Sequence, residues 1–99
     1  MRLTDSERAA VREEVTRVFG ADASVSLFGS RTDDAARGGD IDLYIEADGT
    51  TDQLLDHELR LYARLIRRLG ERRIDIVVHP RGHALRPIDE HARRTGVAL

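Results

Sequence analysis

Two aspartates, Asp40 and Asp42, lie two residues apart in the segment 40–46, in which aliphatic residues occupy alternate positions. A period of two predicts a β-strand with one buried face, so both carboxylates should leave the same face of that strand. Two carboxylates this close repel one another unless a cation lies between them. Such oxygen ligands suit Mg²⁺, which commonly binds one or two carboxylates together with water and substrate phosphates.

A third aspartate, Asp75, interrupts the aliphatic run of residues 73–79, which predicts another strand. If this strand pairs with the one that carries Asp40 and Asp42, the three carboxylates converge. Converging carboxylates are the ligands of a two-metal site for phosphoryl or nucleotidyl transfer, in which one ion binds the phosphates and the other activates the attacking hydroxyl. An isolated Asp-x-Asp, by contrast, is equally well explained by a solvent-facing strand edge.

Gly29 and Ser30 follow a short apolar segment, residues 24–28, which predicts the first strand. Glycine lets the backbone approach a phosphate closely, and serine adds a hydroxyl donor beside backbone N–H groups. A Gly-Ser pair alone usually marks only a turn. Next to the aspartates it forms a candidate triphosphate site that needs no lysine, and the sequence contains no lysine.

Three segments, Leu27–Arg31, Arg37–Glu46 and Arg73–Val78, together resemble the minimal nucleotidyltransferases of the DNA polymerase β superfamily. The shared pattern is Gly-Ser, nine residues, Asp-x-Asp, and then one aspartate on a following strand. The resemblance covers about residues 5–98. It implies the polymerase β-like α+β fold, in which a small mixed sheet of three to four strands is flanked by about four helices.

The resemblance also implies a role for each residue that matches the motif. In the family, the Gly-Ser pair holds nucleotide phosphates and the acids bind two Mg²⁺ ions. Gly29 and Ser30 would accordingly contact the phosphates, and Asp40 and Asp42 would bind both ions. Asp75 would bind the ion that activates the acceptor hydroxyl.

Two further residues are candidates for nucleotide binding. Arg31 could contact a phosphate through two hydrogen bonds, although a surface arginine is the more common role. Gly39 stands where similar families often have serine. Its backbone N–H, with that of Gly38, could replace the missing hydroxyl.

Helix signals flank the predicted strands. Thr4 and Glu7 have the spacing of a capping box and predict a helix over residues 5–19. A further helix begins at Pro87 and ends at Gly96. The residues of this last segment that we expect to face inward are Ile88, Ala92 and Val97.

A long central helix begins at Thr50 or Thr51 and ends at Gly70. Apolar residues recur along it at helical spacing, so we expect them to form one buried stripe. The members of this stripe are Leu54, Leu55, Leu59, Tyr62, Leu65, Ile66 and Leu69.

The 99-residue chain has 40% apolar and 34% charged residues, which predicts a single folded domain over residues 1–99. Without cysteine or lysine it has no thiolate nucleophile, cysteine-ligated zinc or Walker A loop. The net charge of −2 disfavours direct binding of nucleic acid. We expect no signal peptide, because the N-terminal region turns acidic at once, and no membrane span, so the expected location is cytoplasmic.

The resemblance implies a Mg²⁺-dependent enzyme that transfers a nucleotidyl group, with ATP as the expected donor of AMP, to a hydroxyl. Similar small proteins commonly act beside a helical HEPN-type protein in toxin–antitoxin pairs, so the expected acceptor lies on such a partner. The short chain leaves no room for an acceptor-binding domain, which favours a separate partner. Two alternatives stay open: a non-catalytic module that neutralises its partner by contact, and a nucleotide-binding regulator. A homo-oligomer is also left open.

Overall fold

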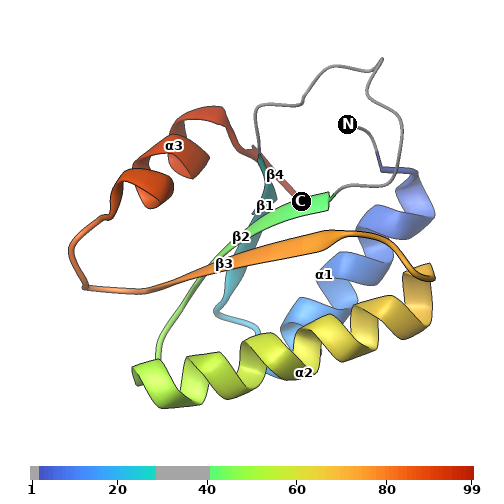
Figure 1. Ribbon diagram of the computed structural model, residues 1–99, viewed down its shortest axis with the longest axis horizontal. Helices are drawn as coiled ribbons and strands as arrows, with labels where there is room; N and C mark the ends of the chain where they lie inside the picture. The colour runs from blue at the N-terminus through green and yellow to red at the C-terminus, as the bar shows by residue number, and fades with distance from the viewer. Residues whose placement is uncertain (1–2, 29–40) are drawn as a thin grey trace.

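The computed structural model describes residues 3–28 and 41–99 (Figure 1). This part of the chain forms three helices and a four-stranded mixed sheet, which confirms the predicted α+β class. The elements in chain order are α1 (Asp5–Phe19), β1 (Ser24–Leu27), β2 (Ile41–Ala47), α2 (Thr51–Leu69), β3 (Ile74–Pro80), α3 (Pro87–Thr95) and β4 (Val97–Ala98).

The sheet has the strand order β3-β2-β1-β4. β2 and β3 run parallel, connected through α2, whereas β1 is antiparallel to both of its neighbours, β2 and β4. β3 is therefore an edge strand of the described sheet. α1 and α2 cover one face of the sheet, and α3 lies against the other (Figure 1).

The helices begin and end at the predicted caps. The Thr4 hydroxyl accepts a hydrogen bond from the backbone N–H of Glu7 at 3.1 Å, and the Glu7 carboxylate accepts one from the backbone N–H of Thr4 at 2.9 Å. Thr50 and Gln53 repeat this arrangement at the start of α2. α2 ends at Gly70, whose φ of 88° lies in the region that favours glycine. Local sequence therefore sets these boundaries.

The main core lies between the sheet and the pair formed by α1 and α2. Ile41, Leu43 and Ile45, at every second position of β2, are fully buried in it. This alternation leaves the side chain of Asp42 on the opposite face of the strand. The other buried members of the main core are Val11, Val15, Val18, Ala47, Leu54, Leu61, Leu65 and Ile74.

The apolar stripe predicted for the long helix is only partly buried. Leu61, which is absent from that predicted stripe, is fully buried beside Leu65. Three residues of the predicted stripe are exposed instead, so the prediction was wrong for them: Leu55, Leu59 and Tyr62, at 54%, 62% and 44%. The apolar face of α2 is wider than the part of the helix that the sheet and α1 cover.

α3 presents a different set of residues to the sheet than predicted. Ala92 is buried, as expected, but Ile88 and Val97 are exposed, so the prediction was wrong for both. Asp89, rather than Ile88, is fully buried, because α3 packs through the side that carries Asp89 and Ala92. Val97 pairs through its backbone with Leu27 in the β1–β4 ladder, which leaves its side chain outside.

One nearly buried carboxylate joins α1 to α2. The Glu14 side chain is 3% exposed and accepts hydrogen bonds from Arg64 and, at 2.8 Å, from Arg68. Hydrogen bonds from Arg64 and then Arg68 hold the pKa of Glu14 below its ordinary value of 4.5. The pair of helices is thus held together by ionic as well as apolar contacts.

Acid should weaken the fold through Glu14. A carboxyl group whose pKa is lower in the folded chain stabilises the fold above its unfolded pKa, and this contribution is lost as the pH falls through the folded pKa. For Glu14 the loss begins near pH 4.5 and continues below it. Glu14→Gln should therefore lower the free energy of unfolding by about 2 kcal/mol at neutral pH and by much less in strong acid. Urea unfolding across this pH range measures both effects.

Glu13→Gln is the matched control for this test. Glu13 is 59% exposed and contacts Arg68 at 3.0 Å, so its ion pair stays in water and contributes little. This variant should stay within about 0.5 kcal/mol of wild type. Two outcomes would contradict the role of Glu14. One is an equal loss of the free energy of unfolding in both variants, and the other is the same pH dependence of that free energy in Glu14→Gln and wild type.

Candidate functional site

The two described aspartates of the predicted site lie side by side. Asp42 in β2 is the register partner of Asp75 in β3, and neighbouring strands in a sheet are about 4.8 Å apart. Register partners in parallel strands point to the same face, so both carboxylates leave the face opposite to that of Ile41 and Leu43. The strand pairing that a convergence of the acids requires is therefore present.

The described residues on either side of positions 29–40 lie beside Asp42. The backbone N–H of Phe28 donates to the carbonyl oxygen of Asp42 at 3.0 Å, and that of Ile41 donates to the carbonyl oxygen of Arg73 at 2.9 Å. Phe28 and Ile41, the described residues on either side of positions 29–40, thus both lie next to this aspartate. The predicted site residues that lie outside the described part of the chain are Gly29, Ser30, Arg31, Gly39 and Asp40.

Asp75 is open to solvent. Its side chain is 56% exposed, and its Oδ2 lies 3.7 Å from Nε of Arg73, which is itself 72% exposed. An ion pair this exposed contributes little and leaves the carboxylate accessible. Asp75 also lines a hollow of about 460 Å³ between α2 and β3, together with Glu58, Leu59 and Tyr62. A small molecule or a side chain of another protein can therefore reach it.

The donor atoms at this position fit a hard divalent cation. Asp42 and Asp75 both offer carboxylate oxygens, which suit Mg²⁺ or Mn²⁺ better than softer metals. Within residues 3–28 and 41–99, no group of three His, Cys, Asp or Glu side chains could hold a metal. A site of the predicted form therefore needs Asp40 as its third acid.

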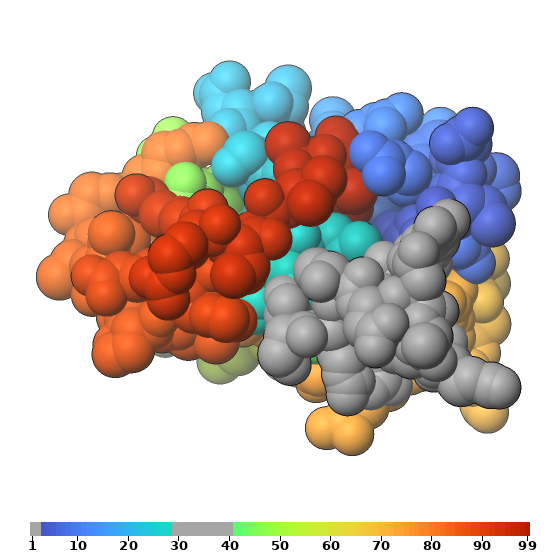
Figure 2. Space-filling view, turned by 90° about the horizontal axis from the view of Figure 1, so that it is seen from above, coloured from blue at the N-terminus to red at the C-terminus, as the bar shows by residue number. Residues whose placement is uncertain are grey.

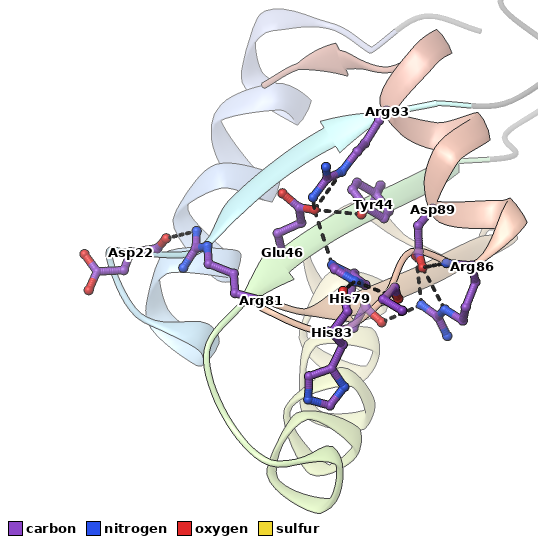
Figure 3. A network of polar contacts seen from close by, with 11 residues as sticks. Asp22, Tyr44, Glu46, His79, Arg81, His83, Arg86, Asp89 and Arg93 are labelled. Atoms are coloured by element: carbon purple, nitrogen blue, oxygen red, sulfur yellow. Dashed lines mark hydrogen bonds and ion pairs between the residues drawn. The ribbon is translucent and has the colours of Figure 1, made fainter.

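α3 packs against the part of β2 that follows Asp42. Tyr44 and Glu46 follow Asp42 along the same side of β2. The Glu46 carboxylate accepts hydrogen bonds from the Tyr44 hydroxyl at 2.8 Å and from Nε of Arg93 in α3 at 2.9 Å (Figure 3). Burial, followed by the hydrogen bond with Glu46, raises the pKa of Tyr44 to about 12, so the phenol remains a donor. Figure 2 shows the molecule from the side of the sheet that carries α3, with α3 in orange to red.

A second polar cluster anchors the start of α3. Asp89 is fully buried and accepts hydrogen bonds of 2.8 to 2.9 Å from the backbone N–H and the guanidinium of Arg86. Hydrogen bonding from Arg86 holds the pKa of Asp89 below its usual value. His79, also buried, places Nε2 3.0 Å from the carbonyl oxygen of His83 and Nδ1 3.4 Å from Glu46 (Figure 3). The Arg86 guanidinium also donates to the carbonyl oxygen of Val78 at 2.9 Å, which joins the start of α3 to β3.

Sequence patterns do not predict this polar network. Arg93 lies 47 residues beyond Glu46, and neither residue belongs to a motif that links them. One local signal does exist for the other cluster, because Arg86 and Asp89 have the spacing of a helix N-cap and its third residue. That spacing predicts the contact between them but not the burial of Asp89.

Removing Arg93 should loosen α3 without unfolding the main core. Arg93→Ala deletes the contact with Glu46, whose side chain is 20% exposed, and should weaken the attachment of α3 to β2. Amide hydrogen exchange across α3 should become about tenfold faster, which mass spectrometry of peptic fragments measures. Arg94→Ala, at an exposed neighbouring position, is the control and should leave exchange unchanged. Undiminished protection of α3 in Arg93→Ala would contradict this role.

The fold and the site together define a class of protein. Enzymes that transfer phosphate-linked groups with two divalent cations hold those ions with carboxylates placed close together, and Asp42 and Asp75 are in register on adjacent strands. The sequence model of the nucleotidyltransferase domain family matches residues 8–95, and the chain belongs to this family. Its general activity is accordingly nucleotidyl transfer. No curated protein matches the chain significantly. Among the described helices, none combines the length and apolar character needed to cross a membrane.

Proposed function

We propose that this protein is a Mg²⁺-dependent nucleotidyltransferase that transfers AMP from ATP to a hydroxyl group. The observation that carries the proposal is the register of Asp42 and Asp75, two aspartates side by side on adjacent strands within a nucleotidyltransferase domain. The choice of Mg²⁺ rests on the hard oxygen donors. The choice of ATP rests on the resemblance to minimal nucleotidyltransferases.

Each candidate residue has a distinct task in this proposal. Asp42 and Asp75, with Asp40 as the third acid, would hold the cations. Gly29 and Ser30 would contact the phosphates through backbone N–H groups and a hydroxyl. Bound Mg²⁺ supplies neutralisation of phosphate charge and a lower pKa of the acceptor hydroxyl. The chain itself contributes the fixed placement of the carboxylates on adjacent strands.

The proposed reaction balances without a redox partner. The acceptor oxygen forms a bond to the α-phosphorus of ATP, and the bond between that phosphorus and the bridging oxygen of the leaving group breaks. Pyrophosphate leaves with the bonding electron pair, and the hydroxyl proton is lost to solvent. Positioning and charge neutralisation would account for most of the rate.

We further propose that the acceptor hydroxyl belongs to a helical HEPN-type protein, for which this chain acts as the antitoxin in the cytoplasm. The resemblance to small nucleotidyltransferases that act beside such proteins supports this assignment. So does the exposure of the Asp75 side chain, which is 56% and leaves this carboxylate within reach of a side chain from another protein.

The intact mass of the partner tests this proposal. The protein is incubated with Mg²⁺, ATP and the HEPN-type protein encoded beside it. The partner should gain one or more AMP units as pyrophosphate is released, and the gain should disappear with EDTA and shrink when GTP, CTP or UTP replaces ATP. A tight complex with no change of mass would contradict transfer and favour neutralisation by contact.

A further inference from the structure

α2 carries an apolar surface that the described residues leave exposed. Leu55, Leu59 and Tyr62 are spaced by four and three positions, so they form one line along the helix, which we call the α2 stripe. The core is filled from the adjacent face of α2, through Leu61 and Leu65. A single exposed leucine is ordinary, whereas these three apolar residues in line form one contiguous exposed patch, which makes them a candidate for an interaction surface.

Charged residues along one side of the α2 stripe change sign between its two ends. With about 100° of rotation per residue, Asp52 and Asp56 lie on this side in the first half of α2, and Arg60 and Arg67 lie there in the second half. All four are exposed. Asp56 and Arg60 approach to 3.8 Å, but both side chains are more than half exposed, so their ion pair leaves both charges available.

We infer that the α2 stripe binds the α2 stripe of a second copy of this chain, with the two helices antiparallel. In this orientation the acidic half of each helix faces the basic half of the other. Residues 56 and 60 lie at similar distances from the middle of the stripe, so Asp56 of one copy comes opposite Arg60 of the other. A parallel pair would instead place the charged side of each helix opposite the other side of the partner's α2 stripe, so the acidic and basic halves would not face one another. A two-fold axis thus lets one sequence supply both halves of the complementary pattern.

The interface is centred on Leu59. α2 has 19 residues and is about 28 Å long, so the contact is smaller than a standard interface, and we expect a dissociation constant on the order of 10 µM. Leu59 and Tyr62 also line the hollow between α2 and β3. The second copy therefore lies at the rim of that hollow, on the face of the sheet opposite to the one from which the Asp75 side chain leaves. The inference does not depend on the chemistry proposed there.

Sedimentation equilibrium of the whole chain, from below to well above 10 µM, tests the inference. The mean mass should rise from 11.1 kDa towards twice that value. Leu59→Asp should raise the dissociation constant at least about thirtyfold. Because Leu59 is exposed, this variant should keep its fold, which circular dichroism checks. Leu85→Asp, at an exposed apolar position outside α2, is the matched control and should leave the dissociation constant unchanged.

A charge exchange tests the antiparallel orientation. Asp56→Arg should weaken association about three- to tenfold. Adding Arg60→Asp should restore it, because opposite charges again face one another across the two-fold axis. Failure of the double variant to recover would overturn the orientation. A chain that stays at 11.1 kDa throughout, or a dimer unaffected by Leu59→Asp, would overturn the inference and leave the α2 stripe to a different protein.

Discussion

Asp42→Asn should lower the rate of nucleotidyl transfer at least about a thousandfold, which corresponds to about 4 kcal/mol of transition-state stabilisation. The substitution keeps the size of the side chain but removes the negative charge that binds a divalent cation. Asp42 is partly buried and lies outside the main core, so the fold should be retained. The rate is measured as pyrophosphate release and mass gain of the partner at saturating Mg²⁺ and ATP.

Asp75→Asn should cause a loss of similar size. The double variant should lose little more than either single variant, because residues that act as one unit are not additive. Glu71→Gln is the matched control, since Glu71 is an exposed carboxylate just before β3, and its rate should stay within about twofold of wild type. An Asp42→Asn rate within about tenfold of wild type would exclude the carboxylate pair from catalysis.

Leu61→Ala should lower the free energy of unfolding by about 3 kcal/mol, a large share of the roughly 5–15 kcal/mol that stabilises a domain of this size. Leu61 is fully buried in the main core, so its truncation removes apolar contact and leaves a cavity. Leu59→Ala, two positions earlier in the same helix, should cost less than about 0.5 kcal/mol because Leu59 is exposed. The pair of variants thus separates burial from residue type.

Thermal and urea unfolding measure this difference. Both variants should be compared at a concentration low enough to keep the chain monomeric. Weaker association through the α2 stripe then does not change the measured free energy of unfolding. Each kcal/mol should lower Tm by about 4–8 °C in a domain of this length. Equal costs for the two variants would show that the core does not use the face of α2 that carries Leu61.

Local patterns in the sequence were enough to predict most elements. The capping boxes that begin at Thr4 and Thr50 set the starts of two helices, because their hydrogen bonds join residues only three apart. The alternation in β2 predicted its buried face, because residues two apart along a strand share one face. The long helix between the two strands indicated that they could run parallel, but their pairing was only a condition of the prediction, and the register of Asp42 with Asp75 comes from the structure.

Tertiary contacts decided the rest. Helical periodicity shows which side of α2 is apolar but not how much of that side a neighbour covers, so Leu55, Leu59 and Tyr62 were expected to be buried. β4 has only two residues and forms because it meets β1, so no pattern within Val97–Ala98 predicts it. The attachment of α3 through Arg93 likewise depends on a residue far away in the chain.

The proposed contacts to the phosphates are inferred from the sequence alone. Gly29, Ser30 and Asp40 fall in the segment outside the described residues, so their roles stay predictions. The fold places the described residues that flank this segment, Phe28 and Ile41, beside Asp42 and one strand away from Asp75.

The binding of Mn²⁺ together with a non-hydrolysable ATP analogue is the most direct measurement of whether Asp42 and Asp75 form a metal–nucleotide site. Electron paramagnetic resonance follows the protein-bound ion as Mn²⁺ is titrated. Wild type should saturate, Glu71→Gln should match it, and Asp42→Asn and Asp75→Asn should each bind at least about tenfold more weakly. Undiminished binding of Mn²⁺ and the analogue in both aspartate variants would contradict the assignment of this site.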